Sequence, residues 1–369
     1  MRAKPFADAS VRQIYNHDIM SCTAEGVTGN HLYSGRVLGA TEPGDVIQIH
    51  PELRSQWSAI RAHYDRIGLS YTDEVIWTTE YQALADHPDH EVSVFFFGPD
   101  EHQARPDDAW FQIVDTINSK NSFMDMANRL GVPVPLTRPF AAVGDISEND
   151  IEAAPYPCYL KAAVSVSGVG IYRCGDPTEL HQAIARFDPT TPVQIQQEVV
   201  AETFLNMQYA NINDDLRRIA VTEQVLDGFV HQGNRYPARC EPWEVVEPMA
   251  AWMHQEGMRG VFAFDVAVVD DGVETKYLAI ECNPRFNGAT YPTAVAQKLG
   301  IAQWLAIALH TQHQSLDGID LSGIEYNPDT GQGVVLVNWG PILVGKILVL
   351  IAGDLESQQR LVEILEQRL

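Results

Sequence analysis

Hydrophobic and polar positions alternate in a strand-then-helix rhythm near the start of the chain. Residues 45–50 (DVIQIH) and 91–98 (EVSVFFFG) are short apolar runs typical of buried strands. Between them, residues 52–68 place apolar side chains at helical spacing and end at a glycine, which predicts an amphipathic helix. The polar, proline-containing residues 99–108 predict a connection. Strands joined through helices are typical of an open α/β domain, so we expect one over residues 1–115.

The pattern changes further along the chain, where strands outnumber helices and follow one another directly. A helix after residue 122 ends at Gly131, because Pro133 and Pro135 forbid its continuation. Further helices are expected at 176–187, 247–257, 354–369 and 292–310, the last with Gly300 as a point where it could break. Strands are expected at 156–163, 171–174, 192–200, 204–212, 219–228, 333–339 and 347–353, with a hairpin over 260–284 that turns at Asp270-Asp271-Gly272. This order predicts α+β subdomains with antiparallel pairing.

Composition and charge narrow the range of partners. Of 369 residues, 45% are hydrophobic and 20% charged, and 49 acids against 25 Lys and Arg give a formal charge of −24. Such an excess of acid argues against nucleic acid or an anionic membrane as a partner. The first residues lack a signal-peptide core, and the apolar run 341–353 is interrupted by Lys346. The five scattered cysteines predict free thiols, so we expect a soluble cytoplasmic protein.

The hairpin over residues 260–284 carries the strongest chemical signal. Glu281 and Asn283 lie two apart in LAIECNPRF and share one face of a strand, and Asp265 interrupts the apolar run FAFDVAV on the preceding strand. With the turn near the middle, the two strands can bring Asp265 and Glu281 level. Two carboxylates and an amide oxygen suit Mg²⁺, and Arg285 would reach a phosphate that the ion holds. The alternative is a strand-end acid before a polar turn, but unpartnered buried charges are costly.

Three weaker signals precede this hairpin. Lys161 stands near the end of an apolar strand, before a loop of small residues in which glycines would let the main chain approach a phosphate. Lys120 stands just before a helix. Residues 194–202 (QIQQEVVAE) could offer main-chain groups to an adenine edge and an acid to ribose hydroxyls. Taken singly, the loop after Lys161 also fits a plain hairpin turn, Lys120 fits a surface lysine, and residues 194–202 fit a strand with a solvated end.

Other motifs are absent or misleading. Residues 340–347 (GPILVGKI) match G-x-x-x-x-G-K, but Ile347 stands where a P-loop needs Ser or Thr, and a strand rather than a helix should follow. We therefore interpret this segment as the turn of a hairpin. The sequence contains no HExxH or GxSxG, no zinc-knuckle spacing, and no GxGxxG after a strand.

The order of these elements resembles the ATP-grasp carboxylate–amine ligases over roughly residues 110–310. The most specific piece is AIECNPRFNG, which is similar to the E-x-N-P-R-x-x-G segment of that family. The resemblance implies an N-terminal preATP-grasp-like α/β domain followed by a two-subdomain ATP-grasp fold. Its implied boundaries are 1–115 for the α/β domain, 116–190 for a small lid subdomain, 191–312 for the subdomain with the metal site, and 313–369 for a C-terminal extension.

The resemblance also implies a role for each candidate residue. Lys120 and Lys161 would contact the α- and β-phosphates of ATP, and Arg285 would steady the transferring phosphate. The metal ligands would be Asp265, Glu281 and Asn283, although the family often has Glu at the first position. The remaining nucleotide-binding residues would be Ser165, Ser167, Gly168 and Gly170 in a closing loop, and Glu198, Val199 and Val200 along the adenine, with Glu202 at the ribose. The family usually has a Gly before that last Glu, where this chain has AETF.

The implied activity is an ADP-forming ligase that uses ATP and one or two Mg²⁺ ions, for which Mn²⁺ could substitute. A substrate carboxylate would be activated as an acyl phosphate and joined to an amine. A kinase of the same fold, or a nucleotide-binding sensor without catalysis, are the alternatives. Arg259 lies near the expected carboxylate side, and His17, His31 and Tyr33 are further candidates for binding a small-molecule substrate. The sequence leaves a homodimer open.

Overall fold

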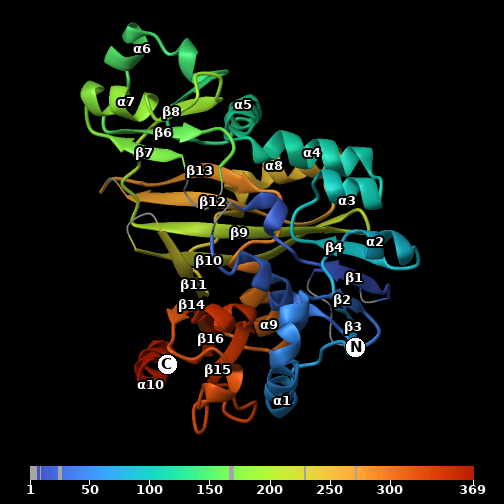
Figure 1. Ribbon diagram of the computed structural model, residues 1–369. Helices are drawn as coiled ribbons and strands as arrows, with labels where there is room; N and C mark the ends of the chain where they lie inside the picture. The colour runs from blue at the N-terminus through green and yellow to red at the C-terminus, as the bar shows by residue number, and fades with distance from the viewer. Residues whose placement is uncertain (1–5, 9, 24–26, 166–169, 228–229, 271) are drawn as a thin grey trace.

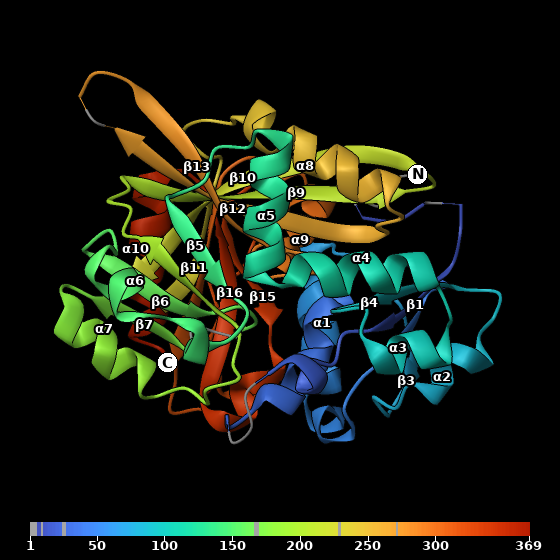
Figure 2. The ribbon, with the colours of Figure 1, turned by 90° about the horizontal axis from the view of Figure 1, so that it is seen from above.

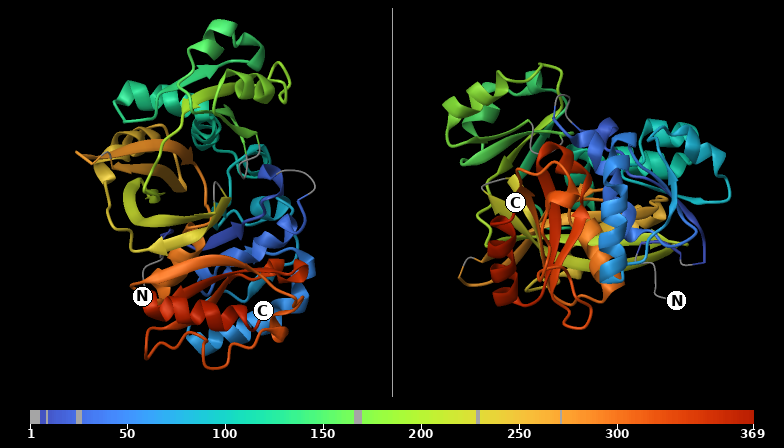
Figure 3. Two further views of the ribbon diagram at one scale, coloured as in Figure 1. Left: turned by 90° about the vertical axis from the view of Figure 1, so that its left-hand side faces the viewer. Right: turned by 60° about the horizontal axis from the view of Figure 1, so that its bottom comes forward.

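The computed structural model describes residues 6–8, 10–23, 27–165, 170–227, 230–270 and 272–369, and these residues form three sheets (Figure 1). An N-terminal four-stranded sheet and a second four-stranded sheet lie on either side of a sheet of eight strands. Figure 3 shows the second small sheet standing clear of the rest, above the large sheet. The fold is therefore mixed, with a parallel N-terminal domain and antiparallel sheets after it, as the sequence predicts.

The N-terminal sheet is parallel throughout and has the order β3-β2-β1-β4. Its strands are β1 (Gln13–Asn16), β2 (Val46–Gln48), β3 (Glu74–Ile76) and β4 (Glu91–Val94). Helix α1 (Trp57–Ile67) ends at Gly68, whose left-handed φ of 71° suits a glycine C-cap. Helix α2 (Gln82–Asp86) precedes β4. The βαβ rhythm predicted for this region is confirmed.

The polar connection predicted at 99–108 is wrong, because helix α3 (Pro99–Ala104) lies there. Pro99 occupies the first helical turn, and the Glu101 carboxylate accepts a hydrogen bond of 3.0 Å from the Gly98 main-chain nitrogen. This capping arrangement starts a helix within a polar segment that has no apolar periodicity. Helix α4 (Asp108–Asn118) follows after Asp107, which caps it.

The second small sheet is antiparallel and has the order β5-β8-β6-β7. Its strands are β5 (Thr137–Phe140), β6 (Cys158–Ala162), β7 (Ile171–Cys174) and β8 (Val193–Gln197). Helices α6 (Glu148–Glu152) and α7 (Pro177–Ile184) pack on it and complete a separate small core around Leu160, Leu180 and Ile195. Helix α5 (Lys120–Leu130) follows α4 and leads from the N-terminal domain into this sheet (Figure 2).

The eight-stranded sheet has the order β13-β12-β9-β10-β11-β14-β16-β15. Its strands are β9 (Thr203–Ile212), β10 (Asp215–Asp227), β11 (Val230–Tyr236), β12 (Gly260–Asp270), β13 (Thr275–Asn283), β14 (Trp304–His310), β15 (Gly333–Asn338) and β16 (Lys346–Ala352). Helix α8 (Trp243–Gln255) lies between β11 and β12 in the chain, and α10 (Leu355–Glu366) closes it. The predicted hairpin is β12–β13, and its Asp271 lies outside the described residues.

The helix predicted over 292–310 is wrong in its second half. Helix α9 (Thr290–Leu299) ends at Gly300, and the apolar residues after it form β14 between β11 and β16. A short apolar run fits a helix or a buried strand equally, and here pairing on both edges decides for the strand. Residues 340–347 connect β15 to β16 through the 3₁₀ helix η6 (Gly340–Val344), so the prediction of a hairpin connection is confirmed.

The N-terminal domain and the C-terminal strands share one hydrophobic core. Tyr64 of α1, Trp304 of β14, Trp339 and Leu365 of α10 belong to the same buried cluster. Figure 3 shows α1, β15 and α10 at the same end of the molecule. The five cysteines are free thiols. Among the helices of the described residues, none is long and apolar enough to cross a membrane.

Candidate active site

Two carboxylates lie level at the end of the β12–β13 hairpin. Asp265 pairs with Glu281 across the two strands, because a bulge between Asp265 and Val266 shifts the register there. Asn283 lies two residues beyond Glu281, and its Nδ2 donates a hydrogen bond of 3.1 Å to Asp265 Oδ2. The three residues expected from the sequence to act together are thus brought together. We call Asp265, Glu281 and Asn283 the acid–amide cluster.

The Asp265 carboxylate is surrounded by amide donors. Asn206 Nδ2 and Gln224 Nε2 donate to Oδ1 at 2.8 and 2.7 Å, and Asn283 donates to Oδ2. Burial, followed by the nearby charge of Glu281, raises the pKa of Asp265 to about 7, although the amides of Asn206 and Asn283 lower it. The Asp265 and Glu281 carboxylates thus lie side by side, and the hydrogen-bond partners of Asp265 are neutral amides.

Glu281 faces two lysines from different elements. Lys120 Nζ forms an ion pair with Glu281 Oε2 at 2.8 Å, and the Lys120 side chain is only 10% exposed. The Lys120 main-chain nitrogen donates to Ala163 O at 2.7 Å, directly after the strand that bears Lys161. Lys161 Nζ donates to Gln196 Oε1 at 2.6 Å. The junction between α5 and the second small sheet therefore holds both ammonium groups beside the hairpin.

Arg285 completes the positive side of the site. Its guanidinium lies over the Phe95 ring, 5.7 Å from the centroid. Burial alone would raise the pKa of Glu281, but Lys120, Lys161 and Arg285 together hold it below its ordinary value. Glu281 is thus an ionised carboxylate among three cations, which is the charge arrangement that a polyphosphate and a divalent cation can share.

Glu198, Val199 and Val200 follow directly after β8. The Glu198 carboxylate is occupied, because Arg173 Nε and Nη2 donate to it at 2.6 and 2.9 Å and the Tyr159 hydroxyl donates at 2.9 Å. Val200 is 83% exposed. Among the described residues, none donates to or accepts from the main chain of Val199 or Val200. The main chain here is therefore free to contact a ligand, while the Glu198 side chain orders the second small sheet.

Glu202 lies at the start of β9, away from the ion pairs of the acid–amide cluster. Its main-chain nitrogen donates to Val268 O at 2.9 Å, and its carboxylate is 3.7 Å from Arg239 Nη1. The side chain is 51% exposed. A half-exposed carboxylate with one distant cationic partner is available to hydroxyl donors of a ligand.

The loop between β6 and β7 is described only at its ends. Ser165 is partly exposed, whereas Ser167 and Gly168 lie outside the described residues. Gly170 has a φ of 76°, and a Cβ there would lie 3.2 Å from Ala162 Cβ. Both the backbone conformation and the limited space thus favour glycine at position 170.

The residues that support the site were not singled out in the sequence. Gln196 holds Lys161, and Asn206 and Gln224 hold Asp265. Asn206 and Gln208 are buried polar residues within the otherwise apolar run FLNMQYANI. Polar side chains at alternate positions of a buried strand could have indicated these supporting residues, because buried polar groups require partners.

A cavity of about 500 Å³ lies between β4, α4 and the edge formed by β9 and β12. Arg259 and Arg285 both line it, whereas the acid–amide cluster does not. Arg259 Nε forms an ion pair with Asp107 Oδ2 at 2.8 Å. The structure thus places Arg259 on the wall of a cavity that extends to Arg285. The charge of Arg259 is compensated by Asp107.

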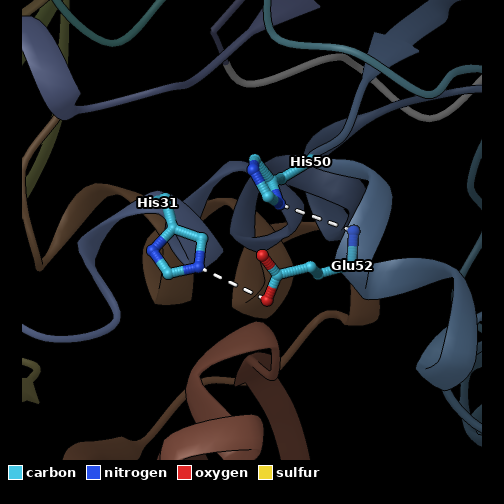
Figure 4. Close-up of side chains that lie close together, drawn as sticks. All are labelled: His31, His50 and Glu52. Carbon is cyan, nitrogen blue, oxygen red and sulfur yellow. Dashed lines mark hydrogen bonds and ion pairs between the residues drawn. The ribbon is translucent and has the colours of Figure 1, made fainter.

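The remaining candidates, His17 and His31, lie in the N-terminal domain. His17 is buried, its Nδ1 is 2.8 Å from the Tyr291 hydroxyl, and burial, then Arg36, lower its pKa well below its usual range. His31 lies beside His50 and Glu52, with His31 Nε2 3.5 Å from Glu52 Oε2 (Figure 4). These three offer ligand atoms within 4.8 Å of one another, but share no residue with the acid–amide cluster. We assign no ion to them.

Comparisons with known proteins bear on the fold. No protein-family model and no curated protein matches the sequence. The structure is similar to N5-carboxyaminoimidazole synthetase from Staphylococcus aureus complexed with ADP, with a TM-score of 0.59 and 12% identity over 99% of this chain and 97% of that one. It is also similar to N5-carboxyaminoimidazole ribonucleotide synthetase from Thermus thermophilus, with a TM-score of 0.58 and 13% identity over 97% and 98% of the two chains.

A third similar structure is carboxyaminoimidazole ribonucleotide synthase from Aspergillus clavatus complexed with ATP, with a TM-score of 0.53 and 12% identity over 89% of this chain and 99% of that one. These neighbours are ATP-grasp carboxylate–amine ligases. At such low identity the likeness concerns the fold, and it extends over nearly the whole chain. The prediction of an N-terminal α/β domain followed by an ATP-grasp fold is confirmed.

Proposed function

We propose that the protein is an ATP- and Mg²⁺-dependent ligase that activates a carboxylate as an acyl phosphate and joins it to an amine, releasing ADP and phosphate. The observation that carries this proposal is the position of Glu281. It forms an ion pair with Lys120 on one side and stands level with Asp265 on the other. A carboxylate held between an ammonium group and a second carboxylate has little structural use, because desolvation of such a set costs free energy.

The acid–amide cluster fits Mg²⁺. Its donors would all be oxygens, two carboxylates and the Asn283 amide oxygen, and hard cations prefer such ligands. Asp265, Glu281 and Asn283 would hold the ion, with phosphate oxygens completing its coordination. When bound, Mg²⁺ would neutralise charge that develops on the phosphate oxygens.

The chain's own residues would position the phosphates and the nucleotide. Lys120 and Lys161 would bind phosphate oxygens, and Arg285 would stabilise the group in transfer. Phosphoryl transfer asks mainly for such positioning and charge neutralisation. The main chain of Val199 and Val200 would bind the adenine edge, and Glu202 would accept hydrogen bonds from ribose.

The loop over residues 165–170 would exclude water from the acyl phosphate. Ser165 and Gly170 are its described ends, and Ser167 and Gly168, which lie outside the described residues, would also contribute. The substrate carboxylate would attack the γ-phosphorus with loss of ADP. An amine would then attack the acyl carbon with loss of phosphate.

Release of ADP and phosphate tests the proposal. Purified protein with Mg²⁺ and ATP is challenged with pools of amino acids, dipeptides, hydroxy acids and amines. Since one similar structure contains ADP and 5-aminoimidazole ribonucleotide, that compound with bicarbonate joins the panel. Glu281→Gln is the blank, because it keeps the shape of the side chain but removes the charge that Lys120 contacts.

The outcomes separate the alternatives. A pool that stimulates release in the wild type only, with an amide identified by mass spectrometry, supports the ligase. A stable phosphoester in place of an amide would indicate a kinase. If MgATP binds and Glu281→Gln weakens that binding, yet no pool gives ADP, the ligase proposal fails and a nucleotide sensor is favoured.

A further inference from the structure

A buried arginine in the N-terminal domain lacks the partner that its geometry requires. Arg36 lies in the 3₁₀ helix η2 (Asn30–Ala40) and is 7% exposed. Its guanidinium lies over the rings of Tyr291, Phe95 and Tyr33, at 4.3, 4.5 and 5.3 Å from their centroids. Among the described residues, no carboxylate forms an ion pair with it. Its Nε and Nη2 are buried without a hydrogen-bond partner.

These two nitrogens lie on one edge of the guanidinium, the edge that binds both oxygens of a carboxylate. The same chain shows that pairing twice. Arg66 Nε and Nη2 donate to the Glu325 carboxylate at 2.8 and 2.7 Å, and Arg173 does the same to Glu198 at 2.6 and 2.9 Å. Arg36 presents this edge in a more buried place, where neither nitrogen has an acceptor among the described residues, although the Tyr291 hydroxyl interacts with the guanidinium. Because an uncompensated buried charge is costly, an oxyanion from outside the chain is the missing partner.

Arg36 is one of the residues that line a cavity of about 160 Å³, whose wall also carries aromatic rings and other polar side chains. The polar and aromatic residues of its wall are Tyr33, Arg36, Gln232, Tyr291, Asn338 and Lys346. Among the described residues no Asp or Glu lines it, although the chain as a whole carries a formal charge of −24. Asn338 is 6% exposed, and its amide oxygen is also buried without a partner. Two cations around a small cavity form a site for an anion, whereas the Asn338 oxygen, which only accepts hydrogen bonds, does not contribute to binding it.

The cavity adjoins the loop that carries Arg285. The Arg36 and Arg285 guanidinia both contact the Phe95 ring, at 4.5 and 5.7 Å from its centroid. Gly288 and Tyr291 of the cavity wall follow Arg285 within six residues of the chain. A molecule bound at Arg36 would thus have the Arg285 side of the candidate active site as its near neighbour.

We infer that this cavity binds the non-reacting oxyanion of the small-molecule substrate, a carboxylate or a phosphate monoester. The identification of the ligand as the substrate rests on the proposed function. Arg36 would hold two oxygens in a fork, and Lys346 would add a second charge. At about 30 Å³ for each water, the cavity has room for about five waters, which suits one such group and two or three attached atoms. The site therefore selects an acidic substrate over a neutral one.

Thermal melting at constant ionic strength tests the inference. The probes are inorganic phosphate, succinate and glycerol 3-phosphate, each titrated against chloride without nucleotide. A ligand that binds only the folded state raises the melting temperature in a concentration-dependent way. We expect at least one probe to stabilise the wild type. A larger effect of succinate would identify a carboxylate site, and a larger effect of glycerol 3-phosphate would identify a phosphate site.

Arg36→Met is the decisive variant. It keeps the volume but removes an unpartnered charge, so without probes it should melt no lower than the wild type. Its apparent Kd for the stabilising probe should rise roughly tenfold to hundredfold, the worth of a charged hydrogen-bonded pair. Lys346→Gln, at a partly exposed position, should weaken the same probe severalfold and covers the case in which Arg36→Met does not fold.

The two proposals can fail separately. Glu281→Gln should keep the stabilisation by the probe and lose that by MgATP, and Arg36→Met should do the opposite. If no probe stabilises the wild type, or if Arg36→Met and Lys346→Gln respond to the probe as the wild type does, the oxyanion site is wrong whatever the result with ATP. Probe binding that depends on Arg36 in a protein that forms no ADP would support the site and refute the ligase.

Discussion

Lys161 should react with amine-modifying reagents far faster than an ordinary lysine does. Burial lowers the pKa of its ammonium from 10.5 to about 8, Glu281 opposes this shift, and Lys120 adds to it. At pH 8 about half of Lys161 would then be neutral, against roughly 0.3% of a lysine with the ordinary pKa, a difference of ~150-fold in nucleophilic amine. Its Nζ donates to Gln196 Oε1, which orients the amine but leaves it partly exposed.

Competitive labelling with trace acetic anhydride, read by mass spectrometry across pH 6–11, measures this pKa for each lysine. The rate at Lys161 should reach half its plateau near pH 8, whereas the half-exposed Lys276 serves as the reference. MgATP should protect Lys161 and leave Lys276 unchanged, because the proposed phosphate contact covers only the former.

Two variants should shift the pKa of Lys161 in opposite directions. Glu281→Gln removes a negative charge that favours the ammonium, so it should lower the pKa of Lys161 further. Lys120→Met removes a positive charge that disfavours it, so it should raise the pKa. A midpoint at Lys161 above pH 10, or shifts of both variants in the same direction, would refute the electrostatic reasoning.

Three further predictions concern stability. Gly170→Ala should lower the free energy of unfolding by about 1–2 kcal/mol in denaturant titrations, because of its left-handed φ and the contact with Ala162, and Gly131→Ala, with φ of 71° and open space, should cost less. Burial would raise the pKa of Glu325, but hydrogen bonds from His63 and Arg66 lower it from 4.5 to about 2. The contribution of the Glu325 carboxylate to stability is therefore complete above about pH 5 and is lost as the pH falls towards 2. The variant Glu325→Gln should be less stable than the wild type by about 1–3 kcal/mol at pH 7 and equally stable near pH 2. A difference in stability that persists at pH 2 would contradict this. Lys298 is 4% exposed and donates to the main-chain oxygens of Thr41 and Ser70, so Lys298→Met should cost about 3–5 kcal/mol in thermal melts, while Lys276→Met should change little.

The acid–amide cluster could be predicted because it depends on a short hairpin. The turn fixes which positions of β12 and β13 face each other to within the one-residue bulge beside Asp265, so a short stretch of sequence suffices to bring Asp265 close to Glu281. The end of helix α9 at Gly300 followed from local chemistry in the same way. Residues 301–310 did not, because their apolar run becomes a strand only through pairing with β11 and β16, which are distant in sequence.

The residues that hold Asp265 and Lys161 in place could not be predicted from the sequence, for the same reason. Gln224 reaches Asp265 across the intervening strand β9, and Gln196 meets Lys161 only because β6 pairs with β8. Arg36 shows the extreme case, since its cavity is lined by residues of η2, β11, α9, β14, β15, η6 and β16, which are far apart in the chain. Nothing near Arg36 in the chain distinguishes it from a surface arginine, and its buried edge becomes visible only in three dimensions.

The acidic composition and the anionic ligands proposed here are compatible because the relevant cations are local and sheltered. A Debye length of about 8 Å at physiological salt screens the distant surface carboxylates from the site. Lys120 is 10% exposed and Arg36 is 7% exposed, so water screens their interactions with a bound anion much less. Of the acids near these two cations, Glu281 alone forms an ion pair with Lys120 among the described residues, and none does so with Arg36. A few buried cations can thus bind phosphate and carboxylate groups within a chain whose surface repels polyanions.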